Sequence, residues 1–314
     1  MISLIIPCFN EEESLPLFYP EATSVLRQMN CDYELIFVND GSRDRTLEIL
    51  KELSEKDPHV IYLSFSRNFG KESAIYAGLH YASGSYISII DADLQQDPEI
   101  VRNMVNILEE KPDIDVVAAY QAQRHEGKLM SWCKDRFYKF INRLSEVDLR
   151  ENASDFRTFR ASVQKALLDM PEYFRFSKGL FSWVGFETEY IPYEAAERFA
   201  GTTKWSFTKL LKYAMEGIIS FSTLPLQLAT FFGAIVSAIA IIYGIVIIAQ
   251  TLITGIDVPG YATTIVVVLF LGGVQLLVMG ILGEYLAKTY IQGKHRPVYI
   301  AKNVLEKKNT KEEN

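Results

Sequence analysis

The stretch YISIIDADLQ, residues 86–95, combines a strong strand signal with a strong site signal. Its apolar run from Ile87 to Ile90 is rich in β-branched residues and is typical of a strand buried on both faces. Two carboxylates, Asp91 and Asp93, follow directly. Strands of this kind form parallel sheets that helices cover, and ligands bind such sheets beyond the carboxyl ends of the strands. The stretch therefore predicts an α/β sheet with a site at Asp91 and Asp93.

The N-terminal third of the chain alternates between strand and helix patterns. We expect strands over Ile2–Ile6, Glu34–Val38, Val60–Ser64, Tyr86–Ile90 and Val116–Ala119. We expect helices between them over Ser14–Met29, Arg43–Lys56, Lys71–Ala82 and Pro98–Glu110. Such alternation predicts an α/β fold with a Rossmann-like, mostly parallel sheet.

Polar side chains also follow the first two predicted strands. Asn10, Glu11 and Glu12 come after the first, and Asn39 and Asp40 after the second. A single acidic loop is usually a turn or a helix cap. Loops that meet at one edge of a sheet are better explained by a shared ligand site.

The side chains of Asp91, Asp93 and Gln95 carry the oxygen donors that Mg²⁺ or Mn²⁺ prefers, and these ions also bind phosphate oxygens. Neither GxGxxG nor GxxxxGK[ST] occurs in the chain, which argues against a Rossmann dehydrogenase and a P-loop NTPase. The pattern that remains is a nucleotide diphosphate held through a metal ion.

Composition excludes several other classes of protein. The 314 residues are 49% hydrophobic and 23% charged, which rules out global disorder. The net charge of −7 disfavours a nucleic-acid binder. Cys8, Cys31 and Cys133 lie far apart, so the spacing suggests neither a disulfide framework nor a zinc site.

Two long stretches near the C-terminus lack charge. The first covers 40 residues between Glu216 and Asp257, and the second covers 26 residues, 258–283. Each can hold a membrane-spanning helix of about 20 residues, and we place the spans near 226–252 and 262–282. The alternative is a helical hairpin buried in a soluble core. Residues 206–221 alternate apolar residues with lysines, which favours an amphipathic helix at the membrane surface.

Basic residues flank this pair of spans on both sides. They are Lys204, Lys209 and Lys212 before the first span, and Lys288, Lys294 and Arg296 after the second. The positive-inside rule therefore predicts that both chain ends face the cytoplasm. We divide the chain into an α/β domain over 1–200, an interfacial helix over 201–224, two transmembrane helices over 225–286 and a cytosolic C-terminal tail over 287–314.

Six segments together resemble a known family. They are IIPCFNEE (5–12), VNDGSRDRT (38–46), SRNFGK (66–71), DADLQQDP (91–98), SDFR (154–157) and RFAGTTKW (198–205). As a set they are similar to family 2 glycosyltransferases with the GT-A fold, in the polyprenyl-phosphate branch that includes bactoprenol glucosyltransferases and dolichol-phosphate mannose synthases. The resemblance covers about residues 1–300, the paired spans included.

The resemblance implies roles for residues at the first two loops. Pro7, Phe9 and Glu11 would border the nucleotide base and ribose, and Asp40 would contact the base. Lys71 is expected to support its loop rather than to touch phosphate.

It also implies a set of residues around the diphosphate. Asp91 would lie beside the nucleotide and the metal, with Asp93 and Gln95 as the other metal ligands. Arg198 and Lys204 would neutralise the diphosphate, a role that suits the planar guanidinium group of arginine. Lys204 is equally compatible with a role as a membrane-surface anchor.

The acceptor is expected to be polyprenyl phosphate at the bilayer surface. Arg124 and Arg136 are the candidates for its phosphate, although many relatives have an arginine where this chain has Gln121. Asp155 and Asp93 are the candidate catalytic residues. A carboxylate near the position of Asp155 acts as a base in sugar-to-hydroxyl relatives, whereas here it is expected to orient the acceptor or the sugar hydroxyl groups.

The expected reaction is inverting transfer of a hexose from a UDP-sugar, with glucose favoured, to undecaprenyl or another polyprenyl phosphate for cell-envelope glycosylation. Mg²⁺ or Mn²⁺ is the implied cofactor, and a homo-oligomer such as a tetramer is the implied assembly in the inner membrane. Three alternatives stay open: another sugar such as N-acetylglucosamine, a processive polysaccharide synthase, and a non-enzymatic membrane scaffold. The chain lacks the QxxRW motif of the processive synthases.

Overall fold

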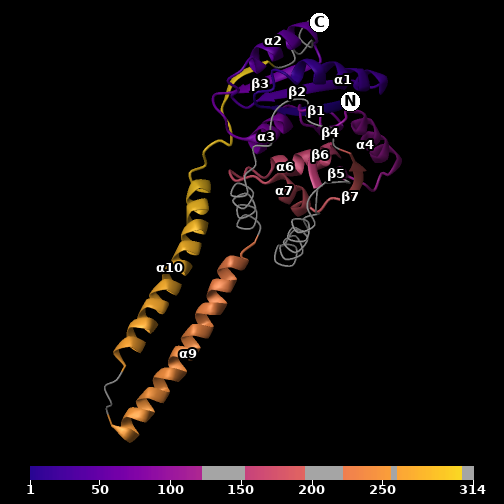
Figure 1. Cartoon of the computed structure of the whole chain (residues 1–314). Helices are drawn as coiled ribbons and strands as arrows, with labels where there is room; N and C mark the ends of the chain where they lie inside the picture. The colour runs from indigo at the N-terminus through magenta and orange to yellow at the C-terminus, as the bar shows by residue number, and fades with distance from the viewer. Residues whose placement is uncertain (122–152, 195–221, 256–259, 306–314) are drawn as a thin grey trace. The chain divides into compact units, whose positions relative to one another are not determined.

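The computed structural model describes residues 1–121, 153–194, 222–255 and 260–305. The chain divides into two compact units. One unit joins Met1–Leu211 to the C-terminal segment Arg296–Asn314, and the other is Lys212–His295. Figure 1 labels the helices and strands of both units.

The first unit is built on an eight-stranded sheet with the strand order β7-β5-β6-β4-β1-β2-β3-β8. Strands β4, β1, β2 and β3 are parallel to one another, whereas β6 and β8 run antiparallel to their neighbours. The strands are β1 (Ile2–Cys8), β2 (Tyr33–Asn39), β3 (Val60–Phe65), β4 (Tyr86–Ile89), β5 (Val116–Gln121), β6 (Ala153–Arg160), β7 (Thr188–Tyr193) and β8 (Ala301–Leu305).

Helices cover both faces of this sheet. Helices α1, α2 and α4 pack together on one face, and α3 and α6 pack on the other, where α7 also contacts β6. Their bounds are α1 (Leu15–Gln28), α2 (Thr46–Lys56), α3 (Lys71–Tyr81), α4 (Glu99–Glu110), α6 (Ala161–Leu168) and α7 (Ser177–Trp183). The predicted α/β fold with a mostly parallel sheet is confirmed.

The core follows from the apolar patterns of these elements. Every residue of β2 is buried, as expected for a strand that helices cover on both faces. Helix α4 buries Val101, Met104, Val105 and Leu108, which share one face at helical spacing. Strand β2 also buries Glu34, whose carboxylate accepts hydrogen bonds from Ser3 Oγ (2.6 Å) and the Ser83 backbone N–H (2.7 Å). These bonds offset the cost of burying the group.

The expected C-terminal tail differs from the structure in two ways. Its first residues, from 287, continue helix α10 (Tyr261–Gln292). Residues Ala301–Leu305 then form β8, which pairs antiparallel with β3, and the Tyr299 ring stacks on Phe65 with centroids 5.0 Å apart. The first unit is therefore not the contiguous 1–200 of the prediction, because the chain returns to complete the sheet edge. The interfacial helix expected over 201–224 lies almost wholly outside the described residues.

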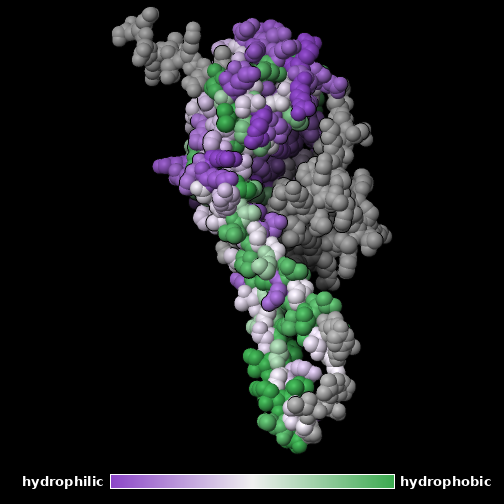
Figure 2. All heavy atoms as spheres, turned by 90° about the vertical axis from the view of Figure 1, so that its left-hand side faces the viewer, coloured by the Kyte–Doolittle hydropathy of each residue, from purple (hydrophilic) through white to green (hydrophobic). Residues whose placement is uncertain are grey.

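The second unit contains two apolar helices, α9 (Leu224–Thr254) and α10. Segments Leu224–Ile253 and Val266–Gln292 have mean hydropathies of 2.7 and 2.5, so both helices are long and apolar enough to cross a membrane. No residue in the most apolar stretch of either helix is buried, and Figure 2 shows hydrophobic side chains along them. Such exposure does not fit the alternative of a hairpin buried in a soluble core.

Gly41 closes the turn after β2 in a conformation that few other residues adopt. Its φ is +65°, and a Cβ there would lie 2.5 Å from the carbonyl carbon of Arg67. Only a residue without a side chain lets the β2–α2 loop approach the loop after β3 this closely. The turn therefore fixes the loop that carries Asp40 against the loop that leads to Lys71.

We expect Gly41→Ala to lower the free energy of unfolding by about 2 kcal/mol or more, because the left-handed backbone costs roughly 1–2 kcal/mol and the methyl group adds a clash. Denaturant unfolding of the full chain in detergent measures the loss. Gly185→Ala is the matched control, since Gly185 has φ +71° but open space around its Cβ. Equal losses in both variants would contradict the close approach.

Candidate functional site

The candidate site lies at the carboxyl ends of β1, β2 and β4, beside the N-terminal half of β6. Asp40 follows β2, and Asp91 and Asp93 follow β4. Asp155 belongs to β6, a strand that the sequence patterns did not predict. The β4–β6 pairing ends at Ile89 opposite Arg157, and because the strands are antiparallel, Asp91 and Asp155 both lie just beyond that pair. The structure thus brings together carboxylates that are far apart in the sequence.

Lys71 connects two of these carboxylates. Its ammonium nitrogen lies 2.6 Å from Asp91 Oδ1 and 2.8 Å from Asp91 Oδ2. The same nitrogen lies 3.3 Å from Asp155 Oδ2. Burial would lower the pKa of Lys71, but the two carboxylates outweigh burial and raise it, so the side chain is fully charged near neutral pH. Lys71 begins α3 as predicted, yet it contacts two site residues rather than only its own loop.

Asp155 is held as an anion by several cations. Burial would raise its pKa, but Lys71, then Lys178 and Arg157, outweigh burial and lower the pKa below the ordinary value. Its Oδ2 faces Lys71, whereas its buried Oδ1 has no hydrogen-bond partner among the described residues. A carboxylate with a lowered pKa is a weak base near neutral pH, but it remains a good hydrogen-bond acceptor.

The loop after β4 makes a tight turn at Asp93. Leu94 has φ +60°, an uncommon backbone conformation for a bulky residue, and the Gln95 N–H donates to Asp93 Oδ1 (3.2 Å). Among the residues that the structure describes, no group of three or more His, Cys, Asp or Glu side chains is arranged to hold a metal ion. The oxygens of Asp93 and Gln95 nonetheless fit a hard divalent cation that takes its remaining ligands from a diphosphate.

Asp40 contacts the backbone of the loop after β3. Its carboxylate accepts hydrogen bonds from the backbone N–H groups of Phe69 (2.6 Å) and Gly70 (2.9 Å), and the side chain is only 3% exposed. Burial raises the pKa of Asp40, and these two bonds oppose the rise. The contacts described here therefore fix the loop that precedes Lys71, while the predicted contact with a base stays a prediction.

The end of β1 supplies an exposed ring and a half-buried acid. Phe9 is 42% exposed, and Pro7 is partly buried within the strand. The pKa of Glu11 is raised, mainly by burial and also by the negative charges of Asp93 and Asp91. Glu11 is therefore near enough to the loop after β4 for the charges of Asp91 and Asp93 to act on its carboxyl group. The backbone N–H of Glu11 is itself held by Thr46 Oγ1 (2.8 Å).

Three further residues of the site were missed by the sequence patterns. Gln96 is buried, accepts the N–H of Asp91 (3.0 Å) and donates to Asp91 Oδ2 (3.3 Å). Glu72 accepts the backbone N–H of Ser177 (2.9 Å) and so ties the start of α3 to α7. Arg157 is buried two residues after Asp155 in β6, and its positive charge contributes to the lowered pKa of Asp155. Gln96 and Arg157 belong to the DADLQQDP and SDFR motifs, in which roles were predicted only for other residues, whereas Glu72 belongs to none of the six segments.

Four of the predicted site residues lie outside the described residues. They are Arg124, Arg136, Arg198 and Lys204. Their proposed contacts with phosphate groups therefore stay predictions.

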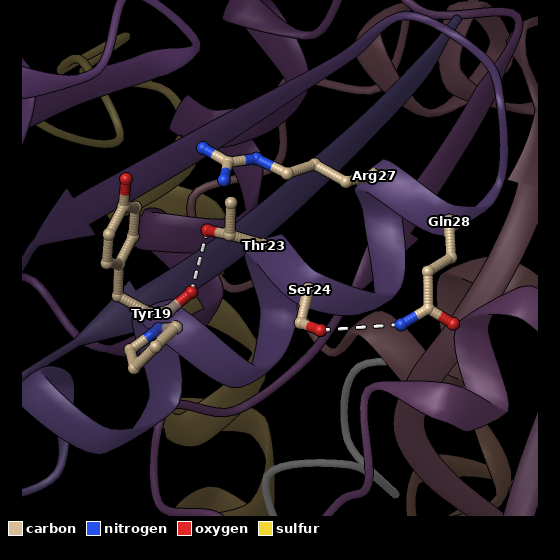
Figure 3. Close-up of a pocket in the computed structure, with 6 residues that line it drawn as sticks. Tyr19, Thr23, Ser24, Arg27 and Gln28 are labelled. Atoms are coloured by element: carbon tan, nitrogen blue, oxygen red, sulfur yellow. Dashed lines mark hydrogen bonds between the residues drawn. The ribbon is translucent and has the colours of Figure 1, made fainter.

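A surface hollow of about 400 Å³ lies away from these residues, along α1. Figure 3 shows its lining, in which Thr23 donates to the Tyr19 carbonyl and Gln28 donates to Ser24. All of its lining residues come from one helix, and none is a carboxylate. The hollow therefore lacks the chemistry of the candidate site.

Comparisons with known proteins agree with this architecture. Residues 3–168 match the model of glycosyl transferase family 2, and residues 224–289 match the GtrB C-terminal hairpin. A prophage bactoprenol glucosyl transferase homolog of Escherichia coli K12 is 43% identical over 96% of this chain and 99% of that protein. The bactoprenol glucosyl transferase of Shigella phage SfV is 42% identical over 98% of this chain and 99% of that protein.

Among solved structures, glucosyl-3-phosphoglycerate synthase of Mycobacterium tuberculosis, in complex with Mn²⁺, UDP and phosphoglyceric acid, matches with a TM-score of 0.49. It is 18% identical, and the match covers 70% of this chain and 76% of that one.

The chain is a glycosyltransferase of family 2, with a GT-A-like α/β domain. Within that family it belongs to the polyprenyl-phosphate glycosyltransferases, because it shares both the catalytic domain and the C-terminal hairpin with the bactoprenol glucosyl transferases. The predicted family and class of enzyme are thus confirmed, and the alternative of a non-enzymatic scaffold is not retained.

We expect Asp40→Asn to lower the free energy of unfolding by about 1–3 kcal/mol, because an amide has one acceptor oxygen where Asp40 uses two. Thermal unfolding of the purified full chain checks this. Asp97→Asn is the control, since Asp97 Oδ1 accepts only the exposed N–H of Glu99 (2.8 Å), which an amide oxygen can also accept. An Asp40 variant as stable as the control would contradict the loop-holding contacts.

Proposed function

We propose that the protein transfers glucose from UDP-glucose to polyprenyl phosphate, with undecaprenyl phosphate as the bacterial form, at the cytoplasmic face of the membrane. The product would be polyprenyl-phosphate-glucose, a glycosyl donor for the cell envelope. One observation carries the proposal. A site with Asp91, Asp93 and Asp155 stands in one chain with two membrane-length apolar helices, and relatives named bactoprenol glucosyl transferase share nearly the whole chain.

The donor side of the reaction uses the loops after β1, β2 and β4. We assign the base and ribose to Pro7, Phe9 and Glu11, and a contact with the base to Asp40. Asp91 lies beside the nucleotide in this scheme. Arg198 and Lys204 neutralise the diphosphate, since cations favour the extra charge that a departing diphosphate acquires.

Asp93 and Gln95, with Asp91 nearby, would hold Mg²⁺ or Mn²⁺. When bound, such an ion offsets negative charge on the leaving diphosphate. The support is the chemistry of the donor atoms and the turn that places Asp93 and Gln95 together.

The bond changes follow from an acceptor that is already an anion. A phosphate monoester has its second pKa near 6, so a phosphate oxygen carries the nucleophilic electron pair at neutral pH. That oxygen bonds to the anomeric carbon while the bond to UDP breaks, and the electron pair leaves with UDP. Attack opposite the leaving group inverts the configuration. No strong base is needed, which agrees with the lowered pKa of Asp155.

The acceptor side requires a membrane and further cations. The lipid chain of polyprenyl phosphate stays in the bilayer, and α9 and α10 would anchor the enzyme beside its headgroup. Arg124 and Arg136 are our candidates for the acceptor phosphate. The basic residues that flank the two spans support a cytoplasmic position for both flanking segments, as the positive-inside rule predicts. We also propose a homo-oligomer, for which a tetramer is the form suggested by the family resemblance.

Two other activities differ from the proposal in ways that an assay separates. A different sugar, such as N-acetylglucosamine, would use the same site, because hexoses differ by small changes around one ring. A processive polysaccharide synthase would need enough membrane spans to enclose a channel for its polymer. The described residues contain two candidate spans. Such a synthase would also build a polymer rather than a single-sugar lipid.

Transfer assays with purified full chain test the function. We expect a labelled lipid from UDP-glucose and undecaprenyl phosphate with Mg²⁺ or Mn²⁺, and loss of the product with EDTA. UDP-N-acetylglucosamine, UDP-galactose and GDP-mannose serve as competing donors. A labelled lipid from another donor would replace glucose, growth of a polymer would favour a synthase, and product formation in EDTA would contradict the metal.

We expect Asp93→Ala to reduce turnover by at least about 100-fold, because a metal ion contributes several kcal/mol of charge stabilisation and each 1.36 kcal/mol is tenfold in rate. Membrane insertion should not change. Asp97→Ala, an exposed aspartate near the same loop, is the matched control and should keep its turnover. Near-normal turnover of Asp93→Ala in Mg²⁺ would remove Asp93 from the metal site.

A further inference from the structure

The bridge formed by Lys71 has a geometry that a surface ion pair lacks. Its ammonium group contacts both oxygens of Asp91 and one oxygen of Asp155, at 2.6, 2.8 and 3.3 Å. An ammonium group has three N–H donors, so these contacts match its capacity. The Lys71 side chain is 41% exposed, whereas the two carboxylates are 28% and 19% exposed. The cation thus lies between two partly buried anions.

The sheet explains why such a cation is required. Strands β4 and β6 are antiparallel neighbours that pair as far as Ile89 opposite Arg157, and Asp91 and Asp155 both lie just beyond that last pair. One ammonium nitrogen lies 2.6 Å from Asp91 and 3.3 Å from Asp155, so the two carboxylates are close neighbours, and like charges this close disfavour each other. Lys71 cancels the repulsion and also sets the separation of the two carboxylates.

Neighbouring groups fix the backbone on both sides of Lys71. Asp40 holds the Phe69 and Gly70 N–H groups directly before Lys71, and Glu72 holds Ser177 directly after it. The first turn of α3 is therefore fixed on both sides of the lysine.

The charges around Asp155 come from three elements. Lys71 and the acid Glu72 approach from α3, Arg157 from β6 itself, and Lys178 from α7. Arg157 lies over the Phe181 ring at 4.1 Å and donates to the Ser154 carbonyl (2.9 Å). The Lys71 nitrogen lies 3.3 Å from Asp155 Oδ2 and forms an ion pair with it.

One oxygen of Asp155 is left for another partner. Lys71 contacts Oδ2, while Oδ1 is buried and has no hydrogen-bond partner among the described residues. A buried carboxylate oxygen without a donor is costly, so its presence at a site calls for a ligand donor. An ionised carboxylate oxygen only accepts hydrogen bonds, and a sugar hydroxyl is a matching donor.

We propose that Lys71 is a positioning residue for glycosyl transfer: it holds Asp155 Oδ2 against Asp91 and leaves Oδ1 to accept a hydrogen bond from a hydroxyl group of the donor sugar. This inference rests on the proposed transfer from UDP-glucose. Asp155 then selects and orients the donor sugar, and Lys71 acts through Asp155 without touching the sugar.

Deoxy analogues of UDP-glucose test the inference. In the wild type, removal of the hydroxyl group that Asp155 binds should lower kcat/KM about tenfold or more, as expected for a hydrogen bond to a charged group. Asp155→Ala and Lys71→Met should both lower kcat/KM for UDP-glucose and lose this discrimination for the same analogue. Lys71→Arg, which keeps the charge, should restore most of it.

Lys111→Met is the matched control. Lys111 forms a 2.6 Å ion pair with Glu189 that joins α4 to β7, with exposures of 49% and 27%. It should keep the discrimination of the wild type. The proposal is overturned if Lys71→Met discriminates like the wild type for every analogue, because a purely structural lysine would lower all rates alike.

Thermal unfolding separates this inference from the proposed function. Lys71→Met should lower Tm, and adding Asp155→Asn should raise Tm again, since the second change removes an unpaired buried charge. If the wild type transfers no glucose yet this recovery occurs, the proposed donor is wrong and the bridge stands. If the double variant melts lower by the sum of the single losses, the bridge is overturned.

Discussion

Two carboxylates held close together at the ends of neighbouring strands repel unless a cation lies between them, and this constraint organises the candidate site. Asp91 and Asp155 stand in that relation because β6 inserts antiparallel beside β4. Lys71, in the first turn of α3, lies between these two carboxylates. Asp40, which follows β2, binds the backbone just before Lys71, and Glu72 ties the same turn to α7. The donor loops, the central strands and α7 are therefore linked through one short segment of backbone.

Much of the fold could be predicted from the sequence, because four parallel strands and their helices carry continuous apolar runs and regular spacing. Strands β6, β7 and β8 were not predicted in that way, and β6 and β8 show why. In β6, Asp155 and Arg157 occupy the face that a core strand would fill with apolar side chains, so its pattern resembles a loop. In β8, five residues of mixed polarity become a strand only because β3 offers an edge. Tertiary pairing, rather than local preference, creates both strands.

The site was predictable to a similar degree. Asp91, Asp93 and Asp155 were identified from their motifs, and the structure places all three around the same strand ends. The contacts of Asp40 and Lys71 were not predictable, because they depend on which loop lies across from which. Asp40 binds backbone N–H groups that no sequence pattern marks, and Lys71 meets Asp155 only through the strand order of the sheet. Residue type suggested the chemistry, whereas topology decided the partners.

The return of the chain to the sheet after α10 constrains how the enzyme is made. Strand β8 shields the edge of β3, yet it is synthesised only after both apolar helices have emerged. Until then, nascent β3 presents unpaired N–H and C=O groups that can recruit a strand from another chain. A fragment that stops before the hairpin keeps this open edge permanently. Soluble expression of the N-terminal unit alone therefore omits a strand of its own sheet, and supplying the 296–305 segment in trans or by fusion would close it.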